Sequence, residues 1–337
     1  MPNFPERTTT APSWKSALAS QEFGLILANL TAWLAILLLD PQHNFASIDS
    51  ARLLLREGVL LGIYAIGAAI VIVAGGIDLS TGSVIAFSGV ICAMVLQALG
   101  GESLAAHQPL PIWVIVAAIL LTLAVGLLIG LFHTLLIRKL DLPPFITTLG
   151  TLAGLRSLAK VLSNDEKISA NNDTFRALYT VWWVPALIFL LVAIGAALLM
   201  RRTVPGRHLY ALGGNEEAAR LSGLPIGRLK ATAYSLAALL SSVAGILYAA
   251  RQGQGDAESA VGYELSAIAA AVVGGCNLRG GQGTITGTIL GVMFLTIVVN
   301  GIANVIKVDS TQWEGLVMGL VLILAVAVNR LKLKRDT

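Results

Sequence analysis

Residues 201–230 read RRTVPGRHLYALGGNEEAARLSGLPIGRLK, a charged and glycine-rich stretch near the middle of an otherwise apolar chain. Within it we predict a short helix that begins after Asn215, because an asparagine at the N-cap accepts hydrogen bonds from the first backbone N–H groups. Glu216 and Glu217 complement the positive end of this helix, and Gly223 ends it. So short a helix is only marginally stable alone in water, so we expect it to have a partner surface.

The composition around this stretch is that of an integral membrane protein. Of the 337 residues, 56% are hydrophobic and 12% are charged, whereas soluble domains carry about 25% charged residues. The mean hydropathy is +0.79 and the sequence pI is near 9.2. The basic residues lie mostly between apolar segments, where they set orientation in the lipid bilayer. The basic pI therefore does not indicate a nucleic-acid partner.

Apolar runs of the length needed to cross a bilayer recur along the chain. A transmembrane helix needs about 20 predominantly apolar residues. The candidate segments are 23–39, 58–74, 83–99, 111–137, 145–163, 181–200, 229–250, 264–275, 284–305 and 312–329. The predicted fold is an all-α membrane protein, a bundle of about ten transmembrane helices with glycine-rich helix breaks. The eighth segment is too short to cross unaided, and glycines interrupt the start of the third.

The Lys and Arg residues between the segments predict the orientation, because such residues favour cytoplasmic loops. They gather after the fourth and sixth segments and in the C-terminal tail, whereas loops such as 100–110 have none. We therefore predict that both termini are cytoplasmic and that 201–230 is a cytoplasmic loop. The predicted divisions are a cytoplasmic tail at 1–22, a transmembrane domain at 23–329 and a cytoplasmic tail at 330–337. No small-residue cleavage site follows the first segment, so we expect it to remain as an anchor.

Two glycine-rich breaks, GGIDLSTG at 75–82 and GGCNLRGGQG at 274–283, share the pattern G-G-x-(D/N)-L-x-x-G. Irregular backbone at membrane depth occurs only where it is buried in protein or lines a watery cavity, and paired interruptions often mark a transport site. An aspartate at the bilayer centre costs about 2.5–3.5 kcal/mol, so Asp78 is a candidate functional residue. In the alternative interpretation both breaks are surface loops, and Asp78 caps the next helix.

Four stretches resemble the membrane-spanning permease subunits of bacterial ABC importers for sugars, of the ribose, xylose and galactose type. They are GGIDLSTG at 75–82, PFITTLGTLAGLR at 144–156, EAARLSG at 217–223 and YELSAIAAAVVGGCNLRGGQGTITGTILG at 263–291. In this order they are specific to the family, and the resemblance covers roughly residues 45–330. The chain departs from the pattern at Ser157, where we expect glycine, and at 277–279, where Asn-Leu-Arg replaces a smaller neutral stretch.

The resemblance implies a fold like that of the type II ABC importers and a role as the sugar path in a bacterial inner membrane. The chain has no G-x-x-x-x-G-K-(S/T) loop to hold ATP phosphates, so a separate ATPase subunit would bind ATP and Mg²⁺, and this chain would bind no cofactor. A periplasmic binding protein would deliver the sugar, and a second permease copy, identical or similar, would complete the path. The residues implied in docking to the ATPase are Asn215, Glu216, Glu217, Ala218, Ala219, Arg220 and Gly223.

Neutral hydrogen-bonding groups inside the segments and breaks suit a path for an uncharged polyol. The residues predicted to line it are Gly75, Gly76, Asp78, Ser80, Thr147, Thr148, Asn277 and Asn300. Polar groups in membrane helices more often form interhelical hydrogen bonds. The sequence offers no paired nucleophile and base and no ligands at metal spacing, so we predict neither a catalytic nor a metal site.

Two other transport functions remain open on the sequence. Permeases for branched-chain amino acids share the same general fold, although the GGIDLS and YELxxIAA forms favour sugar. An ion-coupled secondary transporter would need intramembrane carboxylates that bind and release the ion. The chain offers for this only Asp78 and, near segment ends, Glu264 or Glu314.

Overall fold

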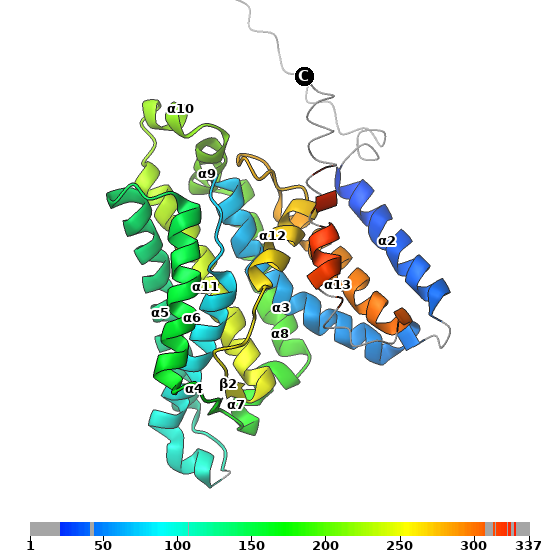
Figure 1. The fold of residues 1–337 in the computed structure, drawn as a ribbon, viewed down its shortest axis with the longest axis vertical. Helices are drawn as coiled ribbons and strands as arrows, with labels where there is room; N and C mark the ends of the chain where they lie inside the picture. Colours follow the sequence, from blue (N-terminus) through cyan, green and yellow to red (C-terminus); the bar gives the residue numbers. More distant parts are fainter. Residues whose placement is uncertain are drawn as a thin grey trace, which may run out of the picture.

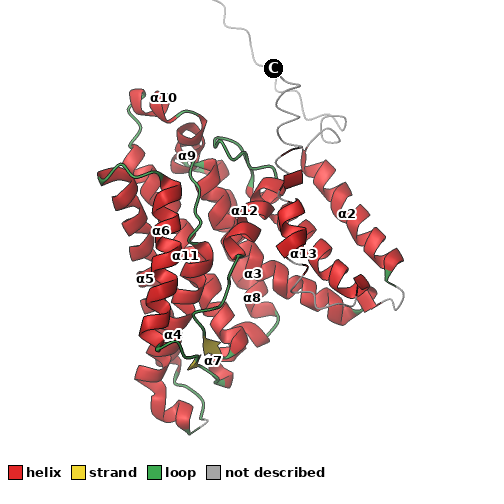
Figure 2. Cartoon of the chain, in the orientation of Figure 1, coloured by secondary structure: helices red, strands yellow, loops and turns green. Residues whose placement is uncertain are grey.

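The computed structural model describes residues 21–40, 44–106 and 108–306, together with some residues between 313 and 327. The described part is a bundle of helices, with strand confined to two short segments (Figures 1 and 2). Its elements are α2 (Gln21–Leu39), η1 (Asn44–Ala46), α3 (Ile48–Val73), α4 (Thr81–Ala105), α5 (Ile112–Lys139), α6 (Pro144–Ser163), β1 (Ile168–Ser169), α7 (Asp173–Thr180), α8 (Trp183–Arg202), α9 (Val204–Gly214), α10 (Glu216–Leu221), α11 (Ile226–Gln252), β2 (Gln254–Gly255), α12 (Tyr263–Val273) and α13 (Ile285–Ile306).

The described residues include eight helices that are long and apolar enough to cross a membrane: α2, α3, α4, α5, α6, α8, α11 and α13. The shorter α12 has 11 residues, or about 16 Å at 1.5 Å per residue, which is about half the thickness of the hydrocarbon core. The prediction of an all-α membrane bundle is confirmed, and so is the short eighth segment. The tenth predicted segment, 312–329, is described only in part, and its described residues (313, 315–321, 323, 324 and 327) are helical.

Contacts between helix ends define two faces of the bundle. Arg201 at the end of α8 pairs with Glu22 at the start of α2 at 3.4 Å, and Thr284 beside α13 donates to the same carboxylate at 3.1 Å. Arg138 at the end of α5 packs against Gly227 at the start of α11. We call this end, from which α10 projects in Figure 1, the α10 face. The other end, with α7 and the strands, is the opposite face.

The centre of the bundle is formed by α3 and α11. Within their most apolar windows, 83% of α3 and 72% of α11 are buried, against 33% for α5 and 22% each for α6 and α8. Small residues allow α11 to lie close to its neighbours: Gly67 on α3 packs against Ala237, and Gly130 on α5 packs against the backbone of Ser235. Close approach of this kind drives helix association where lipid supplies no hydrophobic force. The exposed apolar sides of α5, α6 and α8 are suited to contact lipid.

Three elements outside the long helices were not predicted. The first, α9, begins at Thr203, whose side chain accepts a bond from Gly206 N at 3.2 Å. The second, α7, begins at Asn172, whose side chain accepts from Thr174 N at 3.1 Å. The third is an antiparallel ladder of β1 with β2, in which Ile168 pairs with Gly255. Threonine and asparagine are good N-caps, so a capping signal was present for both helices.

Candidate functional site

The short helix α10 forms where the sequence predicted it and projects beyond the bundle (Figure 1). The side chain of Asn215 accepts a hydrogen bond from Ala218 N at 2.9 Å, as an N-cap does. After the last turn, Gly223 has φ +77, a conformation that L side chains rarely adopt and that commonly ends helices. The cap and the stop predicted from the sequence are therefore confirmed.

The surface of α10 combines charges with an apolar tip. Glu217 pairs with Arg220 on the helix itself, and Glu216 pairs with Lys230 of α11 at 2.7 Å. Ala219 is buried, whereas Leu221 is 81% exposed at the last turn. This leucine lies on the helix that projects beyond the bundle (Figure 1), and no other part of the described chain covers it. Leu221 was not among the residues predicted to dock, although a leucine inside a charged loop was the available signal.

Close packing of glycines joins α9 to both glycine-rich breaks. We call Gly75, Gly213, Gly280 and Gly281 the glycine junction. A Cβ at Gly213 would collide with the carbonyl oxygen of Val73 and lie 2.6 Å from Gly281 N. The Gly281 N–H donates to that same Val73 oxygen at 2.9 Å. Backbones approach this closely only without side chains, so the junction depends on glycine for contact.

A second link between α9 and the later break is made by Tyr210. Its hydroxyl donates to the carbonyl of Gly283 at 2.8 Å. Burial raises the pKa of Tyr210 above its ordinary value, so the hydroxyl keeps its proton and remains a donor at neutral pH. The end of α9 is thus attached to the first break through Gly75 and to the second through Gly281 and Gly283.

The first break enters the interior of the bundle and turns into α4. Asp78 is 3% exposed, and its Oδ1 accepts bonds from Ser80 N at 2.8 Å and Ser80 Oγ at 2.6 Å. Thr148 of α6 donates to the carbonyl of Ile77 at 3.3 Å. Asp78 therefore stabilises the turn into α4 from a buried position, but the N-cap of that helix is Ser80 and not Asp78. Its Oδ2 is buried without a hydrogen-bond partner among the described residues.

The far end of this break contacts a loop from the opposite face. A Cβ at Gly82 would collide with the Ala260 carbonyl and the Glu264 carboxylate. The 256–262 loop is fixed by Arg156 of α6, which donates to the carbonyls of Ala257, at 2.7 Å, and Ser259. A continuous series of contacts therefore runs from α9 through the first break to the opposite face.

We expect Arg156→Lys to destabilise the folded protein by about 2 kcal/mol. A lysine cannot reproduce the forked geometry of a guanidinium, and hydrogen bonds to charged groups contribute roughly 1.5–3 kcal/mol. The measurement is thermal unfolding of the purified protein in detergent. The matched control is Arg52→Lys, because the pair of Arg52 with Asp49 is exposed, with side chains 64% and 85% accessible. Equal midpoints for both variants would contradict the role given to Arg156.

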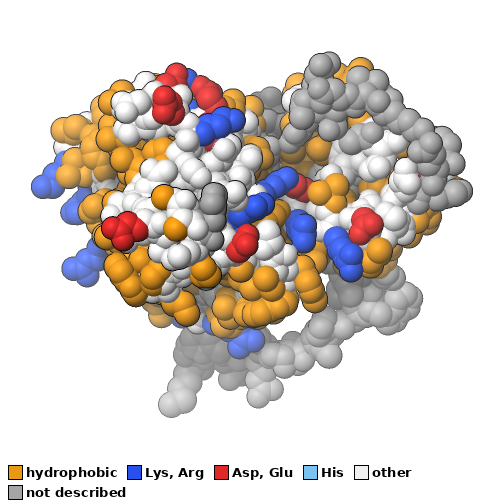
Figure 3. All heavy atoms as spheres, turned by 90° about the horizontal axis from the view of Figure 1, so that it is seen from below, with side chains coloured by type: hydrophobic (Ala, Val, Ile, Leu, Met, Phe, Trp, Pro, Cys, Tyr) orange, Lys and Arg blue, Asp and Glu red, His pale blue; other side chains and the backbone are white. Residues whose placement is uncertain are grey.

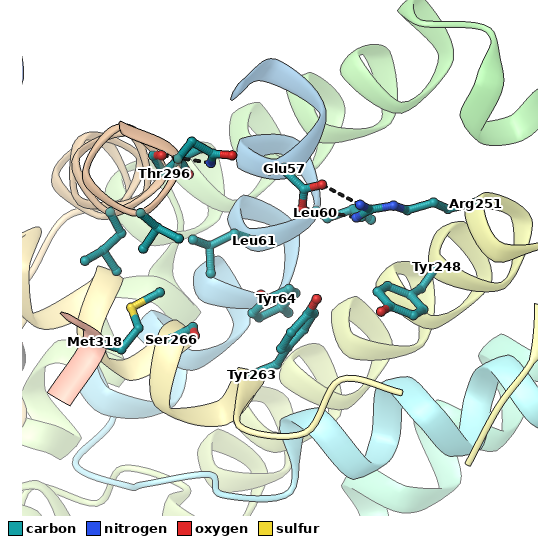
Figure 4. A pocket seen from close by; sticks show the side chains of 13 residues that line it. Glu57, Leu60, Leu61, Tyr64, Tyr248, Arg251, Tyr263, Ser266, Thr296 and Met318 are labelled. Atoms are coloured by element: carbon teal, nitrogen blue, oxygen red, sulfur yellow. Dashed lines mark hydrogen bonds and ion pairs between the residues drawn. The ribbon is translucent and has the colours of Figure 1, made fainter. Parts of the chain in front are cut away.

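A cavity of about 280 Å³ lies between α3, α11, α12 and α13, and Glu57 and Arg251 are part of its wall (Figure 4). Its lining residues are Glu57, Leu60, Leu61, Tyr64, Tyr248, Arg251, Tyr263, Ser266, Leu295, Thr296, Val299, Asn300 and Met318. Arg251 donates to both oxygens of Glu57, with Nη2 at 2.6 Å from Oε1 and Nη1 at 3.1 Å from Oε2. The rings of Tyr64 and Tyr263 stack at 5.6 Å between centroids.

The residues predicted to line a path are divided among three places. Gly75 belongs to the glycine junction, and Gly76 packs against the hydroxyl of Tyr234. Asp78, Ser80, Thr147 and Thr148 are buried around the first break. Asn277 stabilises the second break, where its Oδ1 accepts from Arg279 N at 3.0 Å. Asn300 alone lines the cavity, where its side chain donates to the Thr296 carbonyl at 2.9 Å.

The opposite face carries charges of both signs (Figure 3). Lys160 pairs there with Glu258, and Lys167 pairs with Asp256 at 3.5 Å, so that α6 and the segment after it hold the 256–262 loop. Among the described residues no cluster of three or more His, Cys, Asp or Glu side chains could hold a metal ion.

The chain is a multi-pass helical bundle with irregular breaks inside it and a projecting capped helix, an architecture suited to a membrane transport permease. The family model described as the permease component of branched-chain amino acid transport systems matches residues 51–326, and the chain belongs to this family.

Several curated relatives of the chain carry sugar names. The ribose import permease protein of Escherichia coli strain K12 is 35% identical over 301 residues, covering 86% of this chain and 88% of that protein. The L-arabinose transport system permease protein of the same strain is 37% identical over 317 residues, covering 93% and 92%. The ribose import permease protein of Bacillus subtilis strain 168 is 34% identical over 318 residues, covering 93% and 94%. No solved structure matches the chain.

Proposed function

We propose that this chain is the membrane-spanning subunit of an ATP-driven importer and forms the path for a sugar across the inner membrane. The observation that carries the proposal is the similarity to ribose and L-arabinose import permeases over most of the chain. The proposed substrate is a pentose, a hexose or a related polyol. The chain acts as a conduit rather than as an enzyme.

The proposed site of ATP hydrolysis is a separate ATPase subunit that docks on the α10 face, which is then cytoplasmic. Supporting this, α10 presents exposed charges and the exposed Leu221, and it joins α9, which ends in the glycine junction. Movement of the docked ATPase would displace α9 and, through the junction, both breaks. Packed contacts of this kind transmit rigid-body shifts because they are not continuously deformable.

The opposite face is proposed to receive a periplasmic sugar-binding protein. Its mixed charges suit the complementary charge patterns that steer association. A second permease copy, identical or similar, would complete the path, and both termini would be cytoplasmic. ATP with Mg²⁺ would be held by the ATPase, and we propose no cofactor for this chain.

The family description names branched-chain amino acids, so this substrate is the alternative to be tested. An amino acid needs separate positive and negative partners for its carboxylate and ammonium groups. In the cavity, Arg251 and Glu57 already neutralise each other. The lining carries no net charge, and the names of the curated relatives favour a sugar.

Deleting the gene from its host is expected to abolish uptake of a sugar and to leave L-leucine uptake unchanged. Uptake of radiolabelled D-ribose, L-arabinose and L-leucine would be compared between the deletion strain and the same strain carrying the gene on a plasmid. In the complemented strain, sugar uptake should persist when a protonophore collapses the ion gradient while cellular ATP is maintained. Loss of L-leucine uptake alone, or uptake that stops with the gradient, would contradict the proposal.

A further inference from the structure

The lining of the cavity is polar and aromatic on one side and aliphatic on the other. Figure 4 shows Tyr64, Tyr248 and Tyr263 grouped near the Glu57–Arg251 pair, with Leu61 and Met318 on another side. Ligand pockets in proteins commonly measure about 300–1,000 Å³ and combine apolar walls with a few convergent polar groups. At about 280 Å³ the cavity lies near the lower end of that range. This volume favours a ligand of one ring over an oligosaccharide.

The Glu57–Arg251 pair presents hydrogen-bonding groups without net charge. Carboxylate oxygens have about four acceptor positions and a guanidinium has five N–H donors. The two contacts between them use only part of this capacity. Vicinal hydroxyl groups of a sugar can both donate to the carboxylate and accept from the guanidinium. The charge-assisted bonds formed in this way are stronger than those between neutral groups.

The tyrosines supply flat apolar surface beside these polar groups. Tyr248 meets Tyr263 edge to face, with 6.0 Å between centroids and 83° between ring planes. Arg251 lies 5.9 Å from the ring centroid of Tyr248, within the range of a cation–π contact. The rings and the ion pair therefore hold one another in place. Such a preorganised set of aromatic and polar groups matches the two faces of a sugar ring, one of C–H groups and one of hydroxyls.

The cavity is also connected to the coupling machinery. Tyr263 and Ser266 belong to α12, whose 11 residues lead directly to Gly274 at the start of the second break. The same break ends at Gly283, to which Tyr210 of α9 donates. A shift of α9 would therefore act on the second break, to which α12 and its cavity residues Tyr263 and Ser266 are joined. A ligand held there would lose its contacts when α12 moves.

We propose that a neutral monosaccharide binds transiently in this cavity during its passage, with its hydroxyls on Glu57, Arg251 and Asn300 and its apolar face on Tyr263. This proposal rests on the proposed function. It assigns to the permease itself a part of the substrate selectivity, in addition to the selection made by a binding protein. The relevant selectivity is between sugars, because the lining is rich in hydrogen-bonding groups.

The test uses the complete transporter with its ATPase and binding protein in proteoliposomes. Three cavity variants, Asn300→Leu, Tyr263→Leu and Tyr263→Phe, are compared with Asn304→Leu. Asn304 is the matched control because it donates to the Asn300 carbonyl at 2.8 Å from the next turn of α13 but does not line the cavity. We expect sugar uptake per ATP hydrolysed to fall at least tenfold in the two leucine cavity variants. Tyr263→Phe keeps the ring and should lose about threefold or less.

A direct binding measurement distinguishes residues that contact a ligand from residues that only stabilise the fold. Saturation-transfer NMR with D-ribose and L-arabinose on the permease–ATPase complex, without the binding protein, should give a sugar signal for the unmodified protein and for Asn304→Leu. The signal should be lost in Tyr263→Leu and Asn300→Leu, while stimulation of ATP hydrolysis by the binding protein is retained in all variants. Retained stimulation shows that these variants fold and dock.

Two outcomes would overturn this inference and leave the proposed function standing. One is normal sugar uptake per ATP in Asn300→Leu and Tyr263→Leu, and the other is a sugar signal that persists in both. Failure of the proposed function looks different, because the unmodified transporter would then take up L-leucine and no sugar. The cavity would in that case be tested with L-leucine as the probe, and loss of its signal in the cavity variants would also overturn the assignment to sugar.

Discussion

Gly213→Ala is expected to reduce sugar uptake by at least tenfold while the protein still inserts into the membrane. The three atoms nearest to the added methyl group would all be backbone: the Val73 carbonyl, Gly281 N at 2.6 Å and Gly75 N at 2.9 Å. A flexible side chain could move aside, but these atoms are backbone of the end of α3 and of the two breaks against which α9 packs. Overpacking of this kind costs about 1–3 kcal/mol. The segments must therefore separate, and the link from α9 to both breaks is weakened.

The neighbouring glycine supplies the control for this prediction. A Cβ at Gly214 would meet nothing within 4 Å, so Gly214→Ala adds the same methyl group one residue away without a collision. Both variants would be measured for membrane abundance, ATP hydrolysis and radiolabelled sugar uptake. Hydrolysis without uptake in Gly213→Ala, beside normal uptake in Gly214→Ala, is the expected pattern. Equal uptake by the two variants would show that the junction does not carry the coupling.

Leu221→Asp is expected to weaken binding of the ATPase subunit by about 30-fold or more. Leu221 is 81% exposed at the tip of α10. A leucine in that position contributes favourable free energy of burial only when a partner covers it. Residues that anchor an interface commonly contribute about 2 kcal/mol or more, which corresponds to about 30-fold in Kd. Aspartate at the same position also places a third acid beside Glu216 and Glu217. The substitution therefore removes the apolar contact and makes the charge of the helix more negative.

Two further variants test whether charge and helix geometry contribute to docking. Glu217→Arg removes the pair with Arg220 and reverses one charge on the exposed surface. Gly223→Pro cannot keep the φ of +77 at the helix end, because proline fixes φ near −65°. Each should leave the protein inserted and uncouple ATP hydrolysis from uptake.

Leu221→Met and Glu102→Arg are the controls for these docking variants. The first keeps an apolar tip, and the second reverses a charge near the other end of the molecule, in the last turns of α4. Affinity would be measured by titrating the solubilised permease with the purified ATPase. Unchanged affinity in Leu221→Asp would remove α10 from the interface.

The helices of the bundle could be predicted because each one is a long apolar run. The first nine predicted segments each overlap a helix, although α3 begins at Ile48, ten residues before the predicted start. The start and end of α10 could also be predicted, since Asn215 and Gly223 act within one short stretch. The missed helix α9 had a capping threonine followed by Pro205 in its first turn, a combination typical of a helix start. The charge of the surrounding stretch obscured that pattern.

The cavity could not be predicted in the same way. Glu57 and Arg251 are 194 residues apart in the sequence, and no local pattern indicates that they meet. The glycine junction could be predicted only in part. The sequence shows the two breaks and the Gly213-Gly214 pair, but it does not show that α9 packs against the two breaks. Asn300 was selected for its polarity, yet its neighbours in the cavity are tyrosines and an ion pair. Contacts between distant segments depend on how the helices pack, which periodicity does not determine.

The hydrogen bonds of Arg156 also constrain how the protein is made. One acceptor, the Ala257 carbonyl, is synthesised 101 residues later, which takes about 5–20 s at typical elongation rates. In that interval α6, the least apolar of the eight long helices, carries an arginine whose insertion near a helix centre costs about 2.5–3.5 kcal/mol. We therefore expect α6 to become stable in the bundle only after α11 and the loop that follows it have been synthesised. The contacts of Arg156 are therefore completed only after about three quarters of the chain has been made, and a chain that ends before residue 257 lacks both acceptors.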